Sequence, residues 1–228
     1  MLNSKLKKLI LVLLLLVVSF TAYVAIINRN SKNMTMRQKI LKAIYPVLTL
    51  LGKVRGKNKE ELSNDTVKPV VPFYTLKGTL NNGKEFNFDS LKGKKILLVN
   101  TASDCGYTPQ YAELQKLYDE HKDKLVIIGF PANDFKEQEK GNDSEIAEFC
   151  KVNYGITFPL MTKSTVVKGN NQNEIFKWLS DENKNGWNNQ QPTWNFSKYL
   201  VNESGVLTKY FAPSLSPLSK EVIAGIEK

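Results

Sequence analysis

Residues 95–109 read Lys-Ile-Leu-Leu-Val-Asn-Thr-Ala-Ser-Asp-Cys-Gly-Tyr-Thr-Pro, and the fold can be inferred outward from them. The apolar, β-branched part, residues 95–101, predicts a buried central strand. The apolar side chains that follow recur at helical spacing, so we expect a helix over residues 108–121 with Pro109 in its first turn. Cys105 therefore lies where a strand gives way to a helix.

This position predicts a reactive thiol at Cys105. Free backbone N–H groups and the helix dipole stabilise an anion, so we expect the pKa of this thiol to be lowered. A small structural cysteine beside a core strand is the alternative, but the order of strand, short turn, cysteine and helix favours reactivity. His121 is the only histidine and lies at the far end of the predicted helix, so neither a Cys-His pair nor a four-ligand zinc site is expected.

The net charge of +10 belongs to the N-terminal part of the chain. Residues 1–68 contain 13 of the 32 Lys and Arg residues but only 3 of the 22 Asp and Glu residues. Residues 69–228 carry equal numbers of both and are neutral. This distribution indicates a membrane surface as partner and argues against nucleic acid.

The N-terminal segment contains an uncharged stretch, residues 9–27, that is long enough to cross a bilayer as a helix. We expect a single-pass membrane anchor over residues 1–28. A cleaved signal peptide, which would make the protein exported, is the alternative. The residues around Ser19 match a cleavage site poorly, which favours the anchor. Lysines precede the stretch and further cations follow it, so the positive-inside rule assigns no orientation.

A second, shorter apolar run with flanking cations covers residues 40–51 and predicts a helix at the membrane interface. Residues 57–71 are polar and then punctuated by proline, which is typical of a linker. We therefore divide the chain into the anchor (1–28), a basic interfacial segment with linker (29–68) and a globular domain (69–228).

The globular domain alternates predicted strands and helices. We expect a hairpin over residues 73–88 around Asn81-Asn82-Gly83, a second hairpin over 194–211 around 202–205, and a second central strand over 125–130 that is closed by Pro131. Helices are expected over 143–153, capped by Asp143 or Ser144, over 172–180 and over 216–227. This order predicts an α/β fold in which helices flank a central mixed β-sheet.

Four stretches together resemble the glutathione peroxidase family in content, order and spacing. They are Val-Asn-Thr-Ala-Ser-Asp-Cys-Gly-Tyr-Thr (99–108), Gly-Phe-Pro-Ala-Asn-Asp-Phe-Lys-Glu-Gln-Glu (129–139), Asn-Tyr-Gly-Ile-Thr-Phe-Pro (153–159) and Trp-Asn-Phe-Ser-Lys-Tyr-Leu-Val (194–201). The resemblance implies a thioredoxin-like fold and no cofactor. It also implies a catalytic tetrad of Cys105, Gln138, Trp194 and Asn195.

The resemblance implies a thiol peroxidase that reduces hydrogen peroxide and organic or lipid hydroperoxides. Cys105 would be oxidised to a sulfenic acid, and Cys150 matches the resolving cysteine of the thioredoxin-dependent branch. Cys150 could instead be a structural apolar residue. Thioredoxin is the expected reductant and glutathione the weaker candidate, because no arginine follows Arg55 to clamp a glutathione carboxylate. A peroxide sensor or thiol relay that passes a disulfide to a partner protein is the alternative function.

Three positions depart from the family pattern. Ala132 replaces a third cysteine that many relatives carry, Asp134 stands where glutamine is usual, and Lys136 stands where glycine is usual. None of the tetrad positions is affected. We expect Asp134 and Lys136 to change the charge beside the entrance for peroxide.

Overall fold

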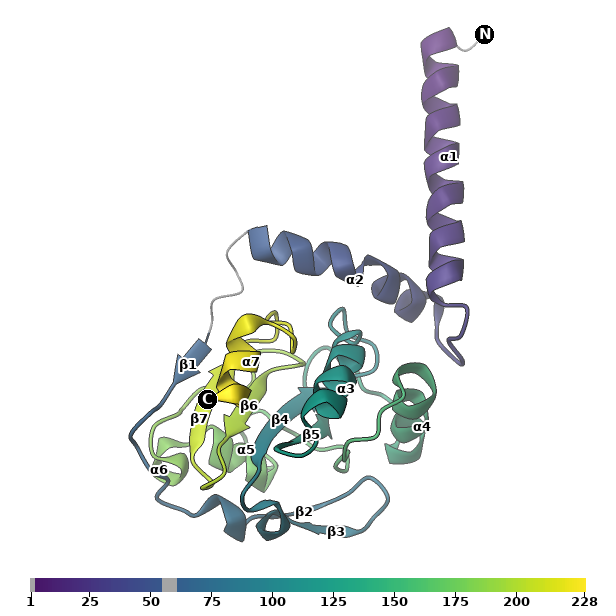
Figure 1. Cartoon of the computed structure of the whole chain (residues 1–228). Helices are drawn as coiled ribbons and strands as arrows, with labels where there is room; N and C mark the ends of the chain where they lie inside the picture. The colour runs from purple at the N-terminus through teal and green to yellow at the C-terminus, as the bar shows by residue number, and fades with distance from the viewer. Residues whose placement is uncertain (1–2, 55–60) are drawn as a thin grey trace.

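A five-stranded sheet lies at the centre of the computed structural model, which describes residues 3–54 and 61–228 (Figure 1). The strand order is β1-β7-β6-β4-β5. The strands are β1 (Glu61–Ser63), β4 (Lys95–Thr101), β5 (Leu125–Pro131), β6 (Lys198–Val201) and β7 (Leu207–Phe211). β4 and β5 are parallel and the other pairs are antiparallel, so the predicted mixed sheet is confirmed.

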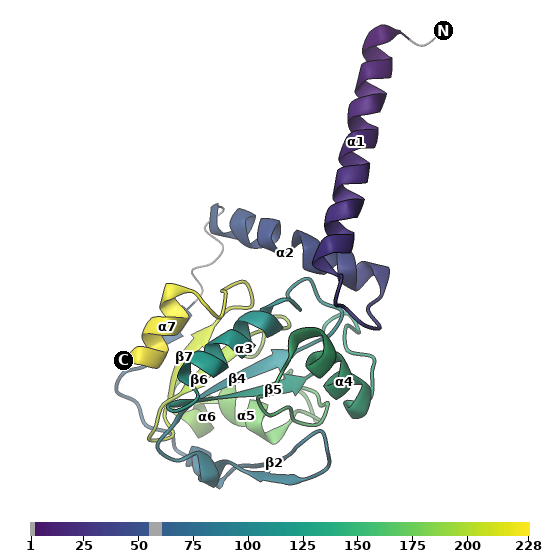
Figure 2. The ribbon, with the colours of Figure 1, turned by 45° about the vertical axis from the view of Figure 1, so that its right-hand side comes forward.

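Helices cover both faces of the sheet, because the central strands are apolar on both sides. Leu97 and Val99 of β4 face one core, which α3 (Gln110–His121), α4 (Asp143–Tyr154) and α7 (Lys220–Glu227) complete. Ile96 and Leu98 face the opposite core, which is closed by α5 (Glu174–Leu179) with the short α6 (Glu182–Asn185) beside it. Figure 2 shows this layering of helices, sheet and helices.

Both predicted hairpins are present. β2 (Lys77–Thr79) pairs with β3 (Glu85–Asn87) across a turn in which Gly83 has φ 82°. The 3₁₀ helices η1 (Phe73–Thr75) and η2 (Phe88–Leu91) flank this hairpin and pack against the core that contains Ile96. The second hairpin, β6–β7, turns at residues 202–205, but its first strand begins at residue 198 and not at 194.

The sheet begins earlier in the chain than the sequence predicts. Residues 61–63, within the predicted linker, form β1. This strand pairs antiparallel with β7, and Glu61 lies opposite Phe211. Asn64 continues the contact, because its side-chain amide donates to the backbone oxygens of Val67 and Leu207. An edge strand of three residues is held by backbone hydrogen bonds, which leave no periodicity in the sequence. The predicted linker also includes residues 57–60, which lie outside the described residues.

The N-terminal segment forms two helices, α1 (Ser4–Ile27) and α2 (Met36–Val54). α1 is long and apolar enough to cross a membrane, a property that an N-terminal signal sequence shares. It stands away from the sheet, whereas α2 lies across the domain, as Figures 1 and 2 both show. The two helices are joined where the Asn28 side chain donates to the carbonyl of Lys39 and Tyr23 Oη donates to that of Ala43.

Candidate active site

Cys105 lies in a turn between β4 and α3 that Thr108 holds in shape. The backbone N–H of Cys105 donates to Thr108 Oγ1 at 3.0 Å, and this hydroxyl donates to the carbonyl of Ala102 at 2.8 Å. α3 begins only at Gln110, so the turn separates the sulfur from the first turn of the helix. The helix dipole is therefore not the main influence on the thiol.

Burial dominates the electrostatics of Cys105. The residue is 1% exposed, and burial raises the pKa of its thiol, the opposite of the predicted direction. Four groups act against burial and keep the pKa lower than burial alone would: the Tyr107 N–H, which donates to Sγ at 3.4 Å, the Trp194 and Asn195 side chains, and the charge of Arg37. The prediction was wrong because it considered the local backbone and not the elements that close over the turn.

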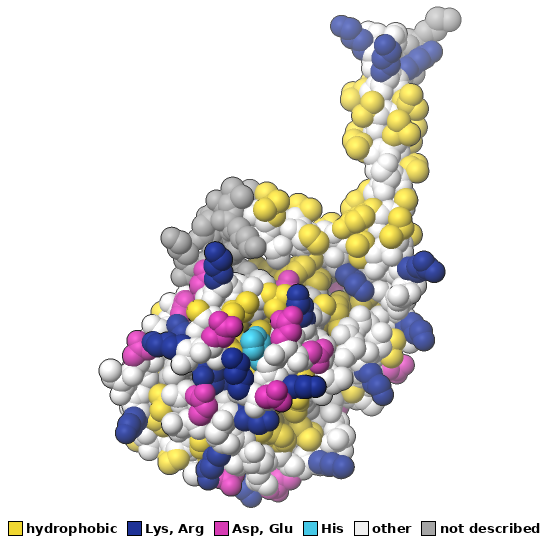
Figure 3. Space-filling view, viewed as in Figure 1, with side chains coloured by type: hydrophobic (Ala, Val, Ile, Leu, Met, Phe, Trp, Pro, Cys, Tyr) yellow, Lys and Arg dark blue, Asp and Glu magenta, His cyan; other side chains and the backbone are white. Residues whose placement is uncertain are grey.

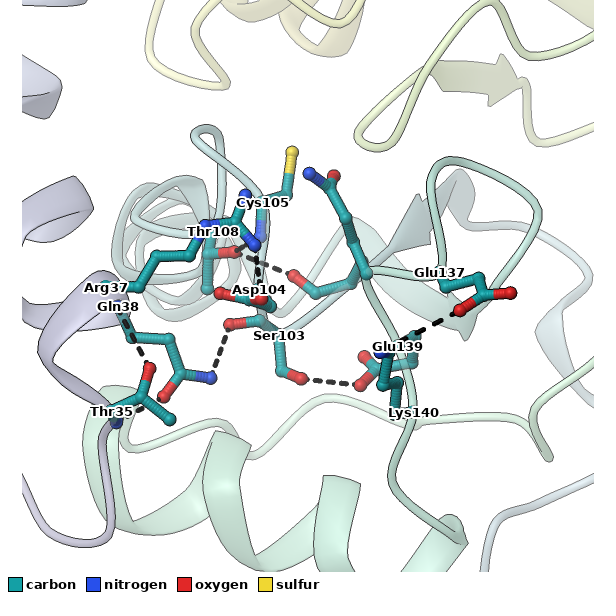
Figure 4. Close-up of polar contacts among 12 residues, drawn as sticks. Thr35, Arg37, Gln38, Ser103, Asp104, Cys105, Thr108, Glu137, Glu139 and Lys140 are labelled. Atoms are coloured by element: carbon teal, nitrogen blue, oxygen red, sulfur yellow. Dashed lines mark hydrogen bonds and ion pairs between the residues drawn. The ribbon is translucent and has the colours of Figure 1, made fainter.

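The four residues of the expected tetrad meet at this turn. Asn195 Nδ2 donates to Gln138 Oε1 at 3.0 Å, and the Asp104 N–H donates to the carbonyl of Gln138 at 3.0 Å. Figure 4 shows the sulfur of Cys105 pointing away from the polar contacts at the base of the turn. Asn195 Oδ1 is buried and has no partner among the described residues. Hydrogen-bond donors that do not titrate thus surround a buried sulfur.

Strained backbone at two loops presents these side chains. Lys136 and Glu137 have φ of 53° and 51°, and they precede Gln138 in the loop after β5. Phe196, which follows Asn195, has φ 69° and donates its N–H to the carbonyl of Asn100 at the end of β4. Non-glycine residues are uncommon in this left-handed region and persist where surrounding contacts hold them.

The three departures from the family pattern have distinct surroundings. Ala132 is buried and donates its N–H to the carbonyl of Thr101. Asp134 accepts from the Val166 N–H at 2.8 Å, so its carboxylate anchors a loop. The ammonium of Lys136 lies 5.7 Å above the Trp194 ring, beside the tetrad. Lys136 thus places a positive charge beside Trp194 of the tetrad.

Cys150 lies on α4 with its side chain in the core that also contains Cys105. Burial raises the pKa of this thiol to about 12, and the two cysteines are not joined in a disulfide. Asn142 caps α4 and forms a capping box with Glu145, so neither Asp143 nor Ser144 is the cap.

A cavity of about 310 Å³ lies between α4, the loop at Glu139 and Gly141, and the turn that joins α1 to α2.

Glu139 carries a buried carboxyl group next to the tetrad residue Gln138, and no sequence motif predicts a role for it. Ser103 Oγ donates to its Oε1 at 2.6 Å, whereas its Oε2 has no partner among the described residues. Burial raises the pKa of this carboxyl group to about 7. The carboxyl follows Gln138 directly in the sequence, but only its depth in the fold distinguishes it from a solvated loop residue.

We predict that Glu139→Gln stabilises the protein at pH 8 and not at pH 4. The folded protein holds a proton on Glu139 between pH 4.5 and about 7 that the unfolded chain releases, so its stability falls as the pH rises through that window. Glutamine removes the ionisation and should raise the free energy of unfolding at pH 8 by about 3 kcal/mol, which corresponds to this pKa change. Urea unfolding of the wild type and the variant at pH 4 and pH 8 measures these free energies. The same difference between the two proteins at both pH values would contradict the prediction.

Lys198 is a second buried ionisable residue that the sequence does not single out. Its ammonium donates to the carbonyls of Leu215 at 2.6 Å, Phe196 at 2.8 Å and Pro213 at 3.3 Å. Burial lowers the pKa of this group to about 7, and the negative charge of Glu113 acts in the opposite direction. Lys198 thereby joins the loop that carries Trp194 and Asn195 to the loop after β7.

Comparisons with known proteins agree with this geometry. A family model described as "Glutathione peroxidase" matches residues 73–180. The chain is 46% identical over 149 residues to "Glutathione peroxidase homolog BsaA" of Staphylococcus epidermidis, covering 65% of this chain and 92% of that protein. It is 44% identical to "Glutathione peroxidase-like peroxiredoxin 2" of Saccharomyces cerevisiae, covering 64% and 91%. The crystal structure of Trgpx in apo form superposes with a TM-score of 0.53 at 30% identity and covers 70% of this chain and 97% of that one, which bears out the thioredoxin-like fold.

Proposed function

Since the chain belongs to the glutathione peroxidase family, we propose that it reduces hydroperoxides with Cys105 as the thiol that reacts first. The observation that carries this proposal is the meeting of Gln138, Trp194 and Asn195 at the Cys105 turn. Such donors stabilise a thiolate and orient a peroxide without changing their own charge.

In the first half of the reaction, the Cys105 thiolate attacks one oxygen of the peroxide. The O–O bond breaks, Cys105 becomes a sulfenic acid, and the leaving oxygen takes a proton and departs as water or an alcohol. Asn195 and Trp194 act on the thiolate by hydrogen bonding, and Gln138 holds the amide of Asn195 in place. The unpartnered Asn195 Oδ1 is an acceptor for the hydrogen of the incoming peroxide.

In the second half, Cys150 attacks the sulfenic sulfur, a disulfide forms, and water is released. Both thiols start in the same core, and Cys150 is fully buried on α4. We infer that this helix unwinds locally to bring the two sulfurs into the geometry of a disulfide. The cavity beside α4 gives its Phe149 face room to move.

We favour thioredoxin over glutathione as the reductant. A disulfide is the substrate of a dithiol protein, and a relative with 44% identity is named a peroxiredoxin. Although no arginine follows residue 55 in the sequence, α2 brings Arg37 to the site. Its guanidinium is paired with Asp104 at 2.5 Å and is thereby already engaged.

The test is a peroxidase assay run in parallel with NADPH, thioredoxin reductase and thioredoxin, and with NADPH, glutathione reductase and glutathione. We expect sustained NADPH oxidation on addition of hydrogen peroxide with thioredoxin, and a rate about tenfold or more lower with glutathione, because the Arg37 guanidinium beside the site is already paired with Asp104. Oxidation of the protein by peroxide without turnover in either system would favour the sensor or relay function.

The N-terminal helices support a membrane-bound arrangement, in which residues 1–28 anchor the chain and α2 lies at the interface. The peroxidase domain then begins at β1 (Glu61–Ser63), earlier than the predicted boundary at residue 69. Apolar side chains cover α1, with lysines at its start (Figure 3). α2 exposes Val47, Leu48, Leu50 and Leu51, although its Ala43 and Tyr45 are buried. An interfacial helix with its apolar side in lipid would hold the Cys105 turn near lipid hydroperoxides.

We predict that the protein stays in the membrane fraction after washing at high salt and at alkaline pH. Electrostatic attachment alone would be lost at high salt, because salt screens the attraction of about 1 kcal/mol per cation to the lipid surface. A spanning helix resists both washes. Fractionation, followed by sequencing of the mature N-terminus, distinguishes a retained anchor from a cleaved signal peptide. Release into the wash, or a mature chain that begins beyond Ser19, would show that the segment is a signal peptide.

A further inference from the structure

α2 is attached directly to the turn that carries Cys105. Arg37 Nη1 forms an ion pair with Asp104 Oδ2 at 2.5 Å, and Gln38 Nε2 donates to the carbonyl of Ser103 at 3.1 Å. One end of α2 therefore holds the two residues that precede Cys105. Figure 4 shows the Arg37 side chain reaching from α2 over Asp104 to the side of the Cys105 turn.

Further along, α2 is held independently of Arg37. Tyr45 Oη donates to Glu113 Oε1 on α3 at 3.1 Å, and Ser216 Oγ donates to the other oxygen of the same carboxylate at 2.6 Å. Ala43 of α2 is buried between these contacts and the α1 junction. Loss of the Arg37 side chain should therefore leave α2 in place.

The charged and hydrogen-bonding groups around the Cys105 sulfur come from several elements. Arg37 belongs to α2, Asp104 and Tyr107 to the turn itself, Lys136 to the loop after β5, and Glu139 lies behind Ser103. Asp104 is the neighbour of Cys105 in the chain, and a carboxylate there opposes a second negative charge on the sulfur. Arg37 pairs with this carboxylate and also acts on the thiol with its own positive charge.

We propose that Arg37 is an electrostatic positioning residue for Cys105, supplied by the membrane-proximal helix, so that the peroxide-reacting site is complete only while α2 is docked. The proposal rests on the proposed role of Cys105. The ion pair is 56% exposed on the arginine side and 34% on the aspartate side, so it contributes little to folding. The positive charge of Arg37 instead stabilises the thiolate of Cys105.

The test compares Arg37→Gln and Asp104→Asn in the full-length protein by the pH dependence of Cys105 alkylation with iodoacetamide, read by mass spectrometry of the Cys105 peptide. Only the thiolate is alkylated, so the pH at which the alkylation rate is half its maximum reports the pKa of the Cys105 thiol. Arg37→Gln should move the midpoint up by about half a pH unit and slow alkylation at pH 7 about threefold. Asp104→Asn breaks the same ion pair but removes a negative charge, so it should move the midpoint down.

Opposite shifts therefore support the electrostatic role, whereas shifts in the same direction, or none, would overturn it. Arg37→Lys should recover most of the rate, because the charge is retained. Lys116→Gln removes one charge from an exposed pair on α3 and should leave the midpoint unchanged. Alkylation is measured without peroxide. The role of Arg37 and the peroxidase activity are therefore tested separately, and either result can be negative while the other is positive.

Discussion

Replacing Cys105 with serine is expected to abolish hydroperoxide reduction, with kcat/KM lower by about 10³-fold or more. The turn stabilises an anion on sulfur through the Tyr107 N–H and the Trp194 and Asn195 side chains, and a serine hydroxyl stays protonated in the same place. The substitution changes little else, because the contacts of Thr108 that shape the turn involve backbone atoms of Cys105.

The measurement is NADPH oxidation with the thioredoxin system and hydrogen peroxide, on protein whose thermal unfolding matches the wild type. Asn195→Asp is an informative companion, since it keeps the size of the side chain but places a negative charge beside the thiolate, and it should slow the first oxidation. If the serine variant retained more than a few per cent of turnover, Cys105 would not be the reacting group.

Replacing Cys150 with serine or alanine should stop turnover with thioredoxin while the first oxidation of Cys105 remains. One equivalent of peroxide should then be consumed per chain, and the sulfenic acid should persist and react with dimedone. The alanine variant serves as a control for serine, because Cys150 is fully buried among apolar residues and a hydroxyl there adds a desolvation cost.

Peptide mass spectrometry and hydrogen exchange test the same prediction in the wild-type protein. Peroxide should produce a disulfide between Cys105 and Cys150, and exchange should rise in α4 (Asp143–Tyr154), since Cα atoms more than about 7 Å apart cannot be bridged without backbone movement. Recovery of only higher oxides of Cys105, or unchanged turnover in both Cys150 variants, would assign Cys150 a structural role.

The regular elements of the domain could be predicted from sequence because local patterns determine them. The apolar runs of β4 and β5 could only be buried strands, and Gly83 and Gly205, with φ of 82° and 79°, mark the two hairpin turns. The cap of α4 was missed by one or two residues. Asn142, Asp143 and Ser144 are all good caps, and only the extended backbone of Asn142 selects one of them.

Motif spacing and hydrophobic periodicity are properties of the chain, and they were enough to predict the family, the two central strands and the residues that meet at the Cys105 turn. The environment of that thiol, by contrast, depends on how the whole domain packs. The pKa of Cys105 is raised because elements far apart in the sequence bury it, and Glu139 is buried for the same reason. Arg37 and Asp104 are 67 positions apart, and they form an ion pair only because α2 docks on the turn. Burial and long-range charge contacts depend on where every element packs, so no local pattern could have revealed them.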